Sequence, residues 1–304
     1  MKTLVAHADY MITLHGGTNA DAGPLVITFG GQPSGLTASG FGTGWCLGKG
    51  WDTIYVAQRA DTQYQDLPLE TFVGAVAKVV EGRDVVCYGS SLGAYAALYY
   101  GGGIDARIVA AAPMLPAWPR LKRPKDAIPL KHLPLNQVPR SRHAPVLIYD
   151  PTHPDDSIMV EQMVRPRYPD ARTITVEFAG HTVLQMLARA GVISRILTPL
   201  IQEGRIVEFE LNLEDNSIWH FHKGRHLMHD DPDQARRHFE RSLDIEPSRH
   251  VIGNLLSLLL RLGDMQAAQE LLDRVAESDH PDMRIPPSNL ERARAAGLDL
   301  GGLQ

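Results

Sequence analysis

The sequence has little cysteine, since Cys46 and Cys87 are the only two in 304 residues. Cys87 lies inside the apolar stretch VVCYG, which favours two reduced, buried thiols over a disulfide-stapled scaffold. The N-terminal MKTLVAHADYM also lacks the apolar core of a secretory signal. Both features predict a cytoplasmic protein.

Long hydrophobic runs and an excess of positive charge are missing as well. No apolar run approaches the ~20 residues that a membrane-spanning helix requires. Lys and Arg number 30 against 35 Asp and Glu, a formal net charge of −5, whereas a nucleic-acid binder needs a basic surface. We therefore expect no membrane and no nucleic-acid partner. The hydrophobic content of 44% is that of an ordinary globular protein with a buried core.

The first two-thirds of the chain alternate between strand-like and helix-like segments. Short apolar runs at 23–31, 51–58, 83–89, 106–113, 144–151 and 172–180 are typical of strands buried on both faces. Helical spacing occupies 69–82 and 91–103 between them, and residues 3–17 alternate like an antiparallel edge hairpin. Strands that alternate with helices predict an α/β protein with a doubly wound, mainly parallel sheet.

The stretch GSSLG, residues 89–93, fits the pattern G-x-S-x-G with a predicted strand before it and a predicted helix after it. In that context the pattern forms a tight turn that exposes the central serine, here Ser91. Gly89 and Gly93 leave room where a Cβ atom would collide with neighbouring backbone. The following helix N-terminus supplies oriented N–H groups where an oxyanion would form. We therefore expect Ser91 to be a nucleophile.

From these residues onward, roughly positions 1–203 resemble the α/β-hydrolase superfamily of serine hydrolases. In that family the nucleophile, the acid and the histidine follow one another along the chain. The resemblance implies that His181, directly after FAG and before a helix, is the base. A serine hydroxyl needs such an imidazole within hydrogen-bond reach because it is a weak nucleophile at neutral pH.

The acid has three candidates in the loop DPTHPDDSIMVEQM after the strand PVLIYD. Asp155 has the closest offset from the strand to that of the family's acid and is favoured. Asp150 lies earlier than the acid usually does, and Asp156 precedes a helical run whose N-cap it would suit. All three alternatives stay open in the sequence.

The resemblance also implies an oxyanion hole made by two backbone N–H groups. One belongs to Leu92, directly after the nucleophile, and the other to Gly31 in FGGQP after the strand LVITF. Residues 114–143 are irregular and rich in proline, as in the short cap that shapes the pocket in many relatives. Basic residues of this segment, Arg120, Lys122, Arg123 and Lys125, would favour an anionic substrate if they reached it.

The last third changes character. After a linker at 204–217, residues 218–304 resemble tetratricopeptide repeats, with Ala235, Phe239, Ser242 and Pro247 at repeat positions. Trp219 is expected to fill the seam between paired helices together with Phe239. Because fewer than three repeats rarely stand alone, we expect this region to dock on the first domain, bind a protein or self-associate. His222 and His226 share a helical face, but no carboxylate or cysteine completes an evident metal site.

The sequence thus predicts a serine hydrolase of esters or thioesters that acts on a small-molecule or acylated substrate through an acyl-enzyme, without cofactor or metal. Two alternatives remain at this stage. An acyltransferase would use the same triad, and a protein-binding scaffold would keep a catalytically silent hydrolase fold.

Overall fold

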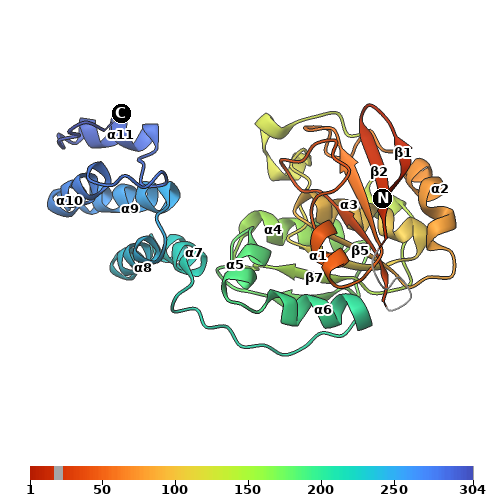
Figure 1. Cartoon of the computed structure of the whole chain (residues 1–304). Coiled ribbons are helices and arrows are strands. Elements are labelled where there is room, and N and C mark those ends of the chain that lie inside the picture. The colour runs from red at the N-terminus through yellow and green to blue at the C-terminus, as the bar shows by residue number, and fades with distance from the viewer. Residues whose placement is uncertain (17–22, 304) are drawn as a thin grey trace. The chain divides into compact units, whose positions relative to one another are not determined.

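The protein is described here from a computed structural model, which describes residues 1–16 and 23–303 (Figure 1). Residues 17–22 and 304, which fall within the two expected domains, lie outside the described residues. The chain divides into two compact units. The first comprises Met1–Glu177 and His181–Phe209, and the second comprises Phe178–Gly180 and Glu210–Gln304.

The first unit is built on one sheet of eight strands in the order β1-β2-β4-β3-β5-β6-β7-β8. The strands are β1 (Lys2–Ala6), β2 (Tyr10–His15), β3 (Leu25–Phe29), β4 (Thr53–Gln58), β5 (Val85–Ser90), β6 (Arg107–Ala111), β7 (Val146–Tyr149) and β8 (Arg172–Thr175). β1 and β2 form an antiparallel hairpin and β2 pairs antiparallel with β4, whereas every other pairing is parallel. The predicted α/β class, with a mainly parallel α/β-hydrolase sheet, is confirmed.

Helices in the first unit lie between these strands along the chain or, for the last two, follow the final strand. They are α1 (Thr43–Gly48), α2 (Leu69–Val80), α3 (Leu92–Gly101), α4 (Pro154–Met159), α5 (Val183–Arg189) and α6 (Ile193–Glu203). A π-helical turn, η6 (Val160–Val164), continues α4, and a 3-10 turn, η2 (Gly102–Ile104), follows α3. The apolar residues of 69–82 and 91–103 thus form helices where their spacing predicts them. The last predicted strand is shorter than expected, since β8 ends at Thr175 rather than at Gly180.

The central strands consist of residues that are buried on both faces of the sheet. All residues of β3 and β4 are buried, as a strand covered on both faces requires. Alternate residues of β3, namely Leu25, Ile27 and Phe29, belong to the core cluster that also contains Phe72 of α2 and Tyr100 of α3. α3 is buried along its whole length. This packing fixes the helix that follows Ser91 against the sheet.

The predicted cap, residues 114–143, contains three short 3-10 turns: η3 (Pro119–Leu121), η4 (Pro124–Asp126) and η5 (Leu135–Gln137). The loop after β4 holds it at several points. The Gln63 side chain accepts a hydrogen bond from the Ala117 N–H at 2.8 Å and donates one to the Asp126 carbonyl at 3.0 Å. The Gln65 carboxamide accepts from the backbone N–H groups of both Lys131 and His132 at 3.0 Å.

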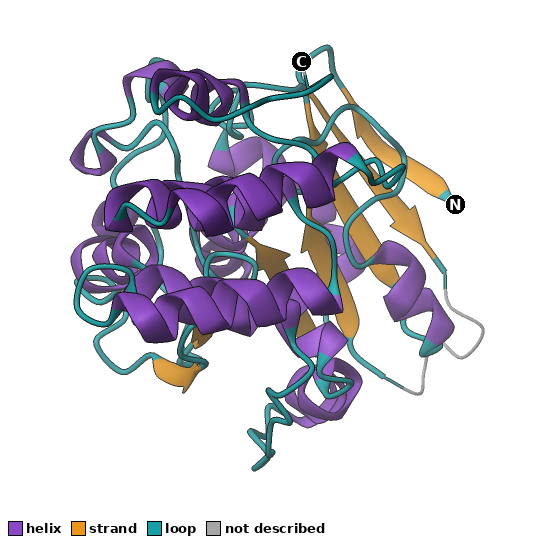
Figure 2. Cartoon of the chain, turned by 90° about the vertical axis from the view of Figure 1, so that its left-hand side faces the viewer, coloured by secondary structure: helices purple, strands orange, loops and turns teal. Residues whose placement is uncertain are grey.

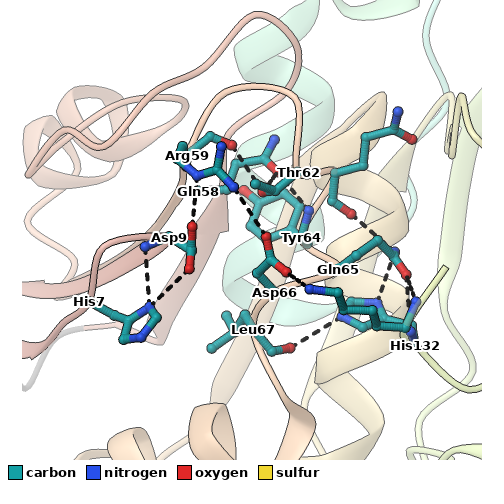
Figure 3. A network of polar contacts seen from close by, with 12 residues as sticks. His7, Asp9, Gln58, Arg59, Thr62, Tyr64, Gln65, Asp66, Leu67 and His132 are labelled. Carbon is teal, nitrogen blue, oxygen red and sulfur yellow. Dashed lines mark hydrogen bonds and ion pairs between the residues drawn. The ribbon is translucent and has the colours of Figure 1, made fainter. Parts of the chain in front are cut away.

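His132 makes several further contacts with the first unit, and Figure 3 shows its ring facing Gln65 and Leu67. Its Nδ1 lies 3.0 Å from the Tyr95 hydroxyl, its Nε2 lies 3.2 Å from the Tyr100 hydroxyl, and the ring stacks on Tyr99 at 4.0 Å. Burial lowers the pKa of His132 to about 4. A neutral imidazole therefore joins the cap to α3.

The second unit contains α7 (Ser217–Leu227), α8 (Pro232–Ile245), α9 (Arg249–Leu262), α10 (Met265–Ala276) and α11 (Pro287–Ala295), and no strand occurs in its described residues (Figures 1 and 2). Its core contains Ala235 and Phe239 of α8. Trp219 contacts α8 through the His238 ring at 5.4 Å, but it is only half-buried and does not belong to this core cluster. The buried face of α7 is Ser217, His220 and Gly224.

Gly224 is the residue of α7 that meets Phe239 in the helix seam. A Cβ atom at position 224 would lie 2.8 Å from the Phe239 ring, so the missing side chain makes room for the aromatic one. The small residue of the pair is thus on α7 and the large one on α8. The sequence of α7 alone does not show that Gly224, rather than Trp219, faces Phe239. The two residues lie on different faces of the helix, and only packing against α8 selects one of these faces.

No single helix of the described residues is long and apolar enough to cross a membrane. The helices Val183–Arg189 and Ile193–Glu203 meet the length and composition criteria only as a pair, and they are bent by 120° at the break between them.

Candidate functional site

Ser91 occupies the sharp turn between β5 and α3. Its backbone has φ 55° and ψ −124°, a sparsely populated conformation for a non-glycine residue that persists only where its surroundings enforce it. The Ser91 N–H donates to the Ala111 carbonyl at 2.9 Å, and the Ser91 carbonyl accepts from the N–H groups of Tyr95 at 3.2 Å and Met114 at 3.1 Å. These contacts with β6, α3 and the start of the cap hold the turn.

The two glycines of the motif are required by close backbone approach. A Cβ atom at Gly89 would lie 2.1 Å from the Gly93 carbonyl oxygen, and one at Gly93 would lie 2.3 Å from the Phe29 carbonyl oxygen. Both distances are far inside van der Waals contact. The G-x-S-x-G pattern is therefore a steric requirement of this turn.

His181 lies directly against Ser91. Its Nε2 is 2.8 Å from the Ser91 Oγ, although the two residues are 90 positions apart. Gly180, immediately before it, has φ +62°, which a glycine adopts without the cost a side chain would add. With Nδ1 protonated, Nε2 accepts the hydrogen bond from the serine hydroxyl.

The carboxylate beside His181 belongs to Asp156, whose Oδ1 is 2.7 Å from the Nδ1 of His181. The prediction that favoured Asp155 is wrong in this respect, because Asp155 forms an ion pair with Arg123 of the cap. The sequence interpretation of Asp156 as an N-cap also differs from the structure. His153 is the N-cap of α4 and Asp156 lies within its first turn.

Neighbouring positions of a helix point about 100° apart, so only one of two adjacent aspartates in α4 can face the imidazole. Asp156 is fully buried, whereas the Asp155 side chain is 28% exposed. Asp150, the third candidate, is also buried, but its Oδ1 accepts from the N–H of Thr152 at 2.8 Å and from its hydroxyl at 2.7 Å. Asp150 thus stabilises the turn that leads into α4.

A second histidine contacts the same carboxylate. The Nδ1 of His153 lies 3.2 Å from the Asp156 Oδ1 and 3.4 Å from the Asp156 backbone nitrogen. Protonated, this nitrogen donates to the carboxylate. Deprotonated, it accepts from the backbone N–H. Burial opposes the charge of His153, but the hydrogen bond to Asp156 and its negative charge outweigh burial and raise the pKa of His153.

The same contacts act on the acid. Burial alone would raise the pKa of Asp156, but the hydrogen bonds from His153 and His181 outweigh it and hold this pKa below its ordinary value. Asp156 is therefore ionised near neutral pH. Its Oδ2 is buried and has no hydrogen-bond partner among the described residues. His153 was not among the residues predicted from the sequence, and the pattern His-x-x-Asp at a helix start was the available signal.

The two predicted oxyanion donors flank Ser91. Leu92 is the first residue of α3, so its N–H has no carbonyl partner one turn earlier in the helix. A Cβ atom at Gly31 would lie 3.4 Å from the Ser90 carbonyl oxygen and 4.0 Å from the Ser91 Cβ. The backbone at Gly31 therefore runs alongside the serine, as its predicted position after β3 requires.

A cavity of about 180 Å³ lies between the cap, α3 and η6. Two of its lining residues adjoin the Ser91 turn: Tyr95 donates its N–H to the Ser91 carbonyl, and Leu115 follows Met114, which does the same. The remaining lining residues are Gln65, Trp118, Leu130, His132, Leu133, Pro134, Leu135, Asn136, Gln162, Met163 and Pro166. None of them carries a full charge at neutral pH, since burial keeps His132 neutral.

Two of the basic cap residues are engaged with other protein groups. Arg123 pairs with Asp155. Arg120 donates to the Gln162 side chain at 2.7 Å and lies over the Trp118 ring at 5.8 Å. Lys122 and Lys125 are exposed. Among the described residues, no Lys or Arg side chain lines this cavity. The cavity therefore gives no support to the predicted preference for an anionic substrate.

No protein-family model and no curated protein match the chain. Similar solved structures include the glycosylation associate protein (Gap123) complex from Streptococcus agalactiae, at 15% identity and TM-score 0.46 over 68% of this chain and 47% of that one. The chain therefore spans about half the length of that protein. An alpha-beta serine hydrolase homologue from Coxiella burnetii matches at 13% identity and TM-score 0.40, over 64% of this chain and 97% of that one.

Est1E from Butyrivibrio proteoclasticus matches at 11% identity and TM-score 0.42, over 65% of this chain and 98% of that one. At such values the likeness carries no conclusion about activity. The fold class rests on the strand order and on the turn at Ser91.

Proposed function

We propose that this protein is a serine hydrolase that cleaves an ester or thioester through an acyl-enzyme on Ser91. One observation carries the proposal: His181 is within hydrogen-bond distance of both partners. Its Nε2 lies 2.8 Å from the Ser91 Oγ, and its Nδ1 lies 2.7 Å from the Oδ1 of the buried Asp156. Each group has the form that its role requires, with Asp156 ionised and the Nε2 of His181 against the hydroxyl.

In this mechanism the Ser91 Oγ attacks the carbonyl carbon and the Nε2 of His181 accepts its proton. The ionised Asp156 stabilises the imidazolium that forms. The N–H groups of Leu92 and Gly31 bind the oxyanion, where hydrogen bonds contribute most because negative charge develops there. His181 then protonates the leaving group, and a water molecule that His181 activates hydrolyses the acyl-enzyme.

The uncharged cavity between the cap, α3 and η6, whose lining includes Tyr95 and Leu115 near the Ser91 turn, supports a substrate whose acyl part is compact and neutral. Its lining is dominated by apolar side chains, and the anchors at Gln65 and His132 fix its wall before a ligand arrives. Replacing Met163, which lines the cavity, by Trp is expected to shift the preference from longer acyl esters toward acetate. An unchanged ratio of kcat/KM values between acetate and hexanoate esters would place the acyl group elsewhere.

A fluorophosphonate probe tests the nucleophile directly. It is expected to label the wild-type protein, and Ser91→Ala is expected to abolish labelling. Ser90→Ala is the matched control, since Ser90 is the adjacent serine of the same motif and should leave labelling intact. Labelling that survives Ser91→Ala would contradict the proposal, and hydrolysis of p-nitrophenyl acetate provides the parallel activity measurement.

Acyl transfer to an alcohol or amine uses the same groups and differs only in what attacks the acyl-enzyme. Product analysis with added acceptors distinguishes the two. A free acid as the main product supports hydrolysis, whereas an ester or amide of the acceptor identifies a transferase.

A further inference from the structure

Beside the proposed triad lies a second histidine, His153, which the hydrolytic mechanism does not use. His153 approaches the same Asp156 oxygen as His181 does, from the N-cap of α4. One ligand atom each from His153, Asp156 and His181 lie within 4.8 Å of one another. Two imidazole nitrogens and one carboxylate oxygen form a donor set that Zn²⁺ prefers over Mg²⁺ or Ca²⁺, which favour oxygen ligands alone.

The distances are close to those of a zinc centre. With bonds of about 2.0–2.2 Å to nitrogen and oxygen, adjacent ligands of a tetrahedral zinc lie roughly 3.4 Å apart. The Asp156 Oδ1 is already 2.7 Å from one Nδ1 and 3.2 Å from the other. All three ligand atoms lie within 4.8 Å of one another, so rotation of the two rings brings them to this spacing. The Asp156 Oδ2, which has no hydrogen-bond partner among the described residues, offers a second oxygen.

The carboxylate of Asp156 and the partial exposure of the two histidines also favour the binding of a cation. The Asp156 carboxyl group is fully buried, so a cation that binds to it is shielded from water, which makes the electrostatic attraction stronger. The side chains of His153 and His181 are 20% and 29% exposed, which provides a path for the ion. Asp155, next to this group, is itself paired with Arg123.

We infer that His153, Asp156 and His181 bind a Zn²⁺ ion that inhibits the proposed hydrolase. Binding through the Nδ1 of His181 moves the proton of that neutral ring from Nδ1 to Nε2. An Nε2 that carries a proton cannot accept one from Ser91, so the general base is lost while the ion is bound. His153 distinguishes this site from a serine–histidine–aspartate triad alone, in which one imidazole and one carboxylate offer only two ligands.

The inhibitory effect rests on the proposed function, but zinc binding does not, so the two are measured separately. Zinc binding is titrated with a chelating dye on the full chain without a polyhistidine tag, in the wild-type protein and in Ser91→Ala. One ion is expected to bind tightly to both. Cobalt(II) in place of zinc should give the intense visible absorption of a tetrahedral complex. A wild-type protein that binds no zinc overturns the inference whatever its activity.

His153→Gln is expected to weaken zinc binding by more than about 100-fold, since even partners outside the ligand set cost 10–100-fold. His7→Gln is the matched control, because His7 also lies beside a carboxylate, 3.5 Å from Asp9, and should leave zinc binding unchanged. Asp156→Asn serves as a second variant and should weaken binding likewise, with circular dichroism to verify folding. Equal zinc affinity in wild type, His153→Gln and Asp156→Asn contradicts the site.

If the wild-type protein hydrolyses p-nitrophenyl acetate, zinc should inhibit it, and His153→Gln should raise the inhibitory concentration by the same factor by which binding weakens. Zinc binding without inhibition retains the site but contradicts its effect on His181. Binding to Ser91→Ala together with no turnover by the wild type would instead count against the proposed function.

Discussion

The Ser91 Oγ and the His181 Nε2 are 2.8 Å apart, although 90 positions separate them along the chain. Ser91 follows β5 and His181 follows β8, which lie in one parallel block with β6 and β7 between them. Because parallel strands place their carboxyl ends at one edge of the sheet, residues far apart in sequence meet there. The pair therefore depends on the register of the sheet as much as on either side chain.

Replacing Asp156 should be far more damaging than replacing its neighbour. Asp156→Asn removes the charge that stabilises the His181 imidazolium and is expected to lower kcat by about 10³–10⁴-fold. Asp155→Asn removes only an ion pair with Arg123 and should cost less than about tenfold, since partly exposed pairs contribute little. Steady-state kinetics on p-nitrophenyl acetate measure both. If both substitutions lowered kcat equally, neither aspartate alone could be the acid of the triad.

The turn at Ser91 should not tolerate a methyl group at Gly89. A Cβ atom there meets the Gly93 carbonyl oxygen at 2.1 Å, so Gly89→Ala is expected to destabilise the fold by about 3 kcal/mol. Gly74→Ala is the control, because this α2 glycine has nothing within 4 Å of its Cβ position and should gain up to about 1 kcal/mol. Urea unfolding followed by circular dichroism measures both. Similar midpoints for the two variants would contradict the steric argument.

Stability should fall in mild acid because of His132. Burial lowers its pKa from 6.5 to about 4, so between these values the unfolded chain binds a proton that the folded chain does not. The free energy of unfolding is therefore fully retained above about pH 6.5 and decreases as the pH falls toward 4, by about 3 kcal/mol in total.

His132→Asn should remove much of this pH dependence while lowering stability at pH 7, because it loses contacts with Tyr95 and Tyr100. Urea midpoints at pH 7 and pH 5 make the comparison. The wild-type difference between the two pH values should exceed that of the variant. A wild-type midpoint that does not change with pH would show that His132 is not held neutral by burial.

Both thiols should be unreactive in the folded protein. Burial raises the pKa of Cys46 to about 12 and raises that of Cys87 further, so almost no thiolate is present at pH 8. Ellman's reagent is expected to modify neither cysteine within minutes and to titrate both after unfolding in urea. Rapid reaction of one thiol in the native protein would show that its strand or helix opens readily.

The local sequence was sufficient to predict those features that depend on a residue's immediate neighbours in the chain. Buried strands of continuous apolar residues predicted β3, β4 and β5, because a parallel sheet covered on both faces needs no polar face. Ser91 was identifiable because the turn itself requires Gly89 and Gly93. His181 was identifiable through the resemblance, since it lies in the loop between the last strand and the helix after it.

Features that depend on the direction in which a side chain points could be assigned only from the packed fold. Asp155 and Asp156 are adjacent and chemically equivalent, and only the position of α4 against the sheet places one beside His181 and the other beside Arg123. The anchoring of the cap through Gln63, Gln65 and His132 joins segments more than fifty positions apart, and no local pattern encodes such pairs. The backbone turn and the order of the elements follow from the amino-acid sequence alone, because steric fit and burial act over a few residues. Which carboxylate meets the imidazole follows only from packing, because a helix can present either side chain until the sheet fixes its orientation.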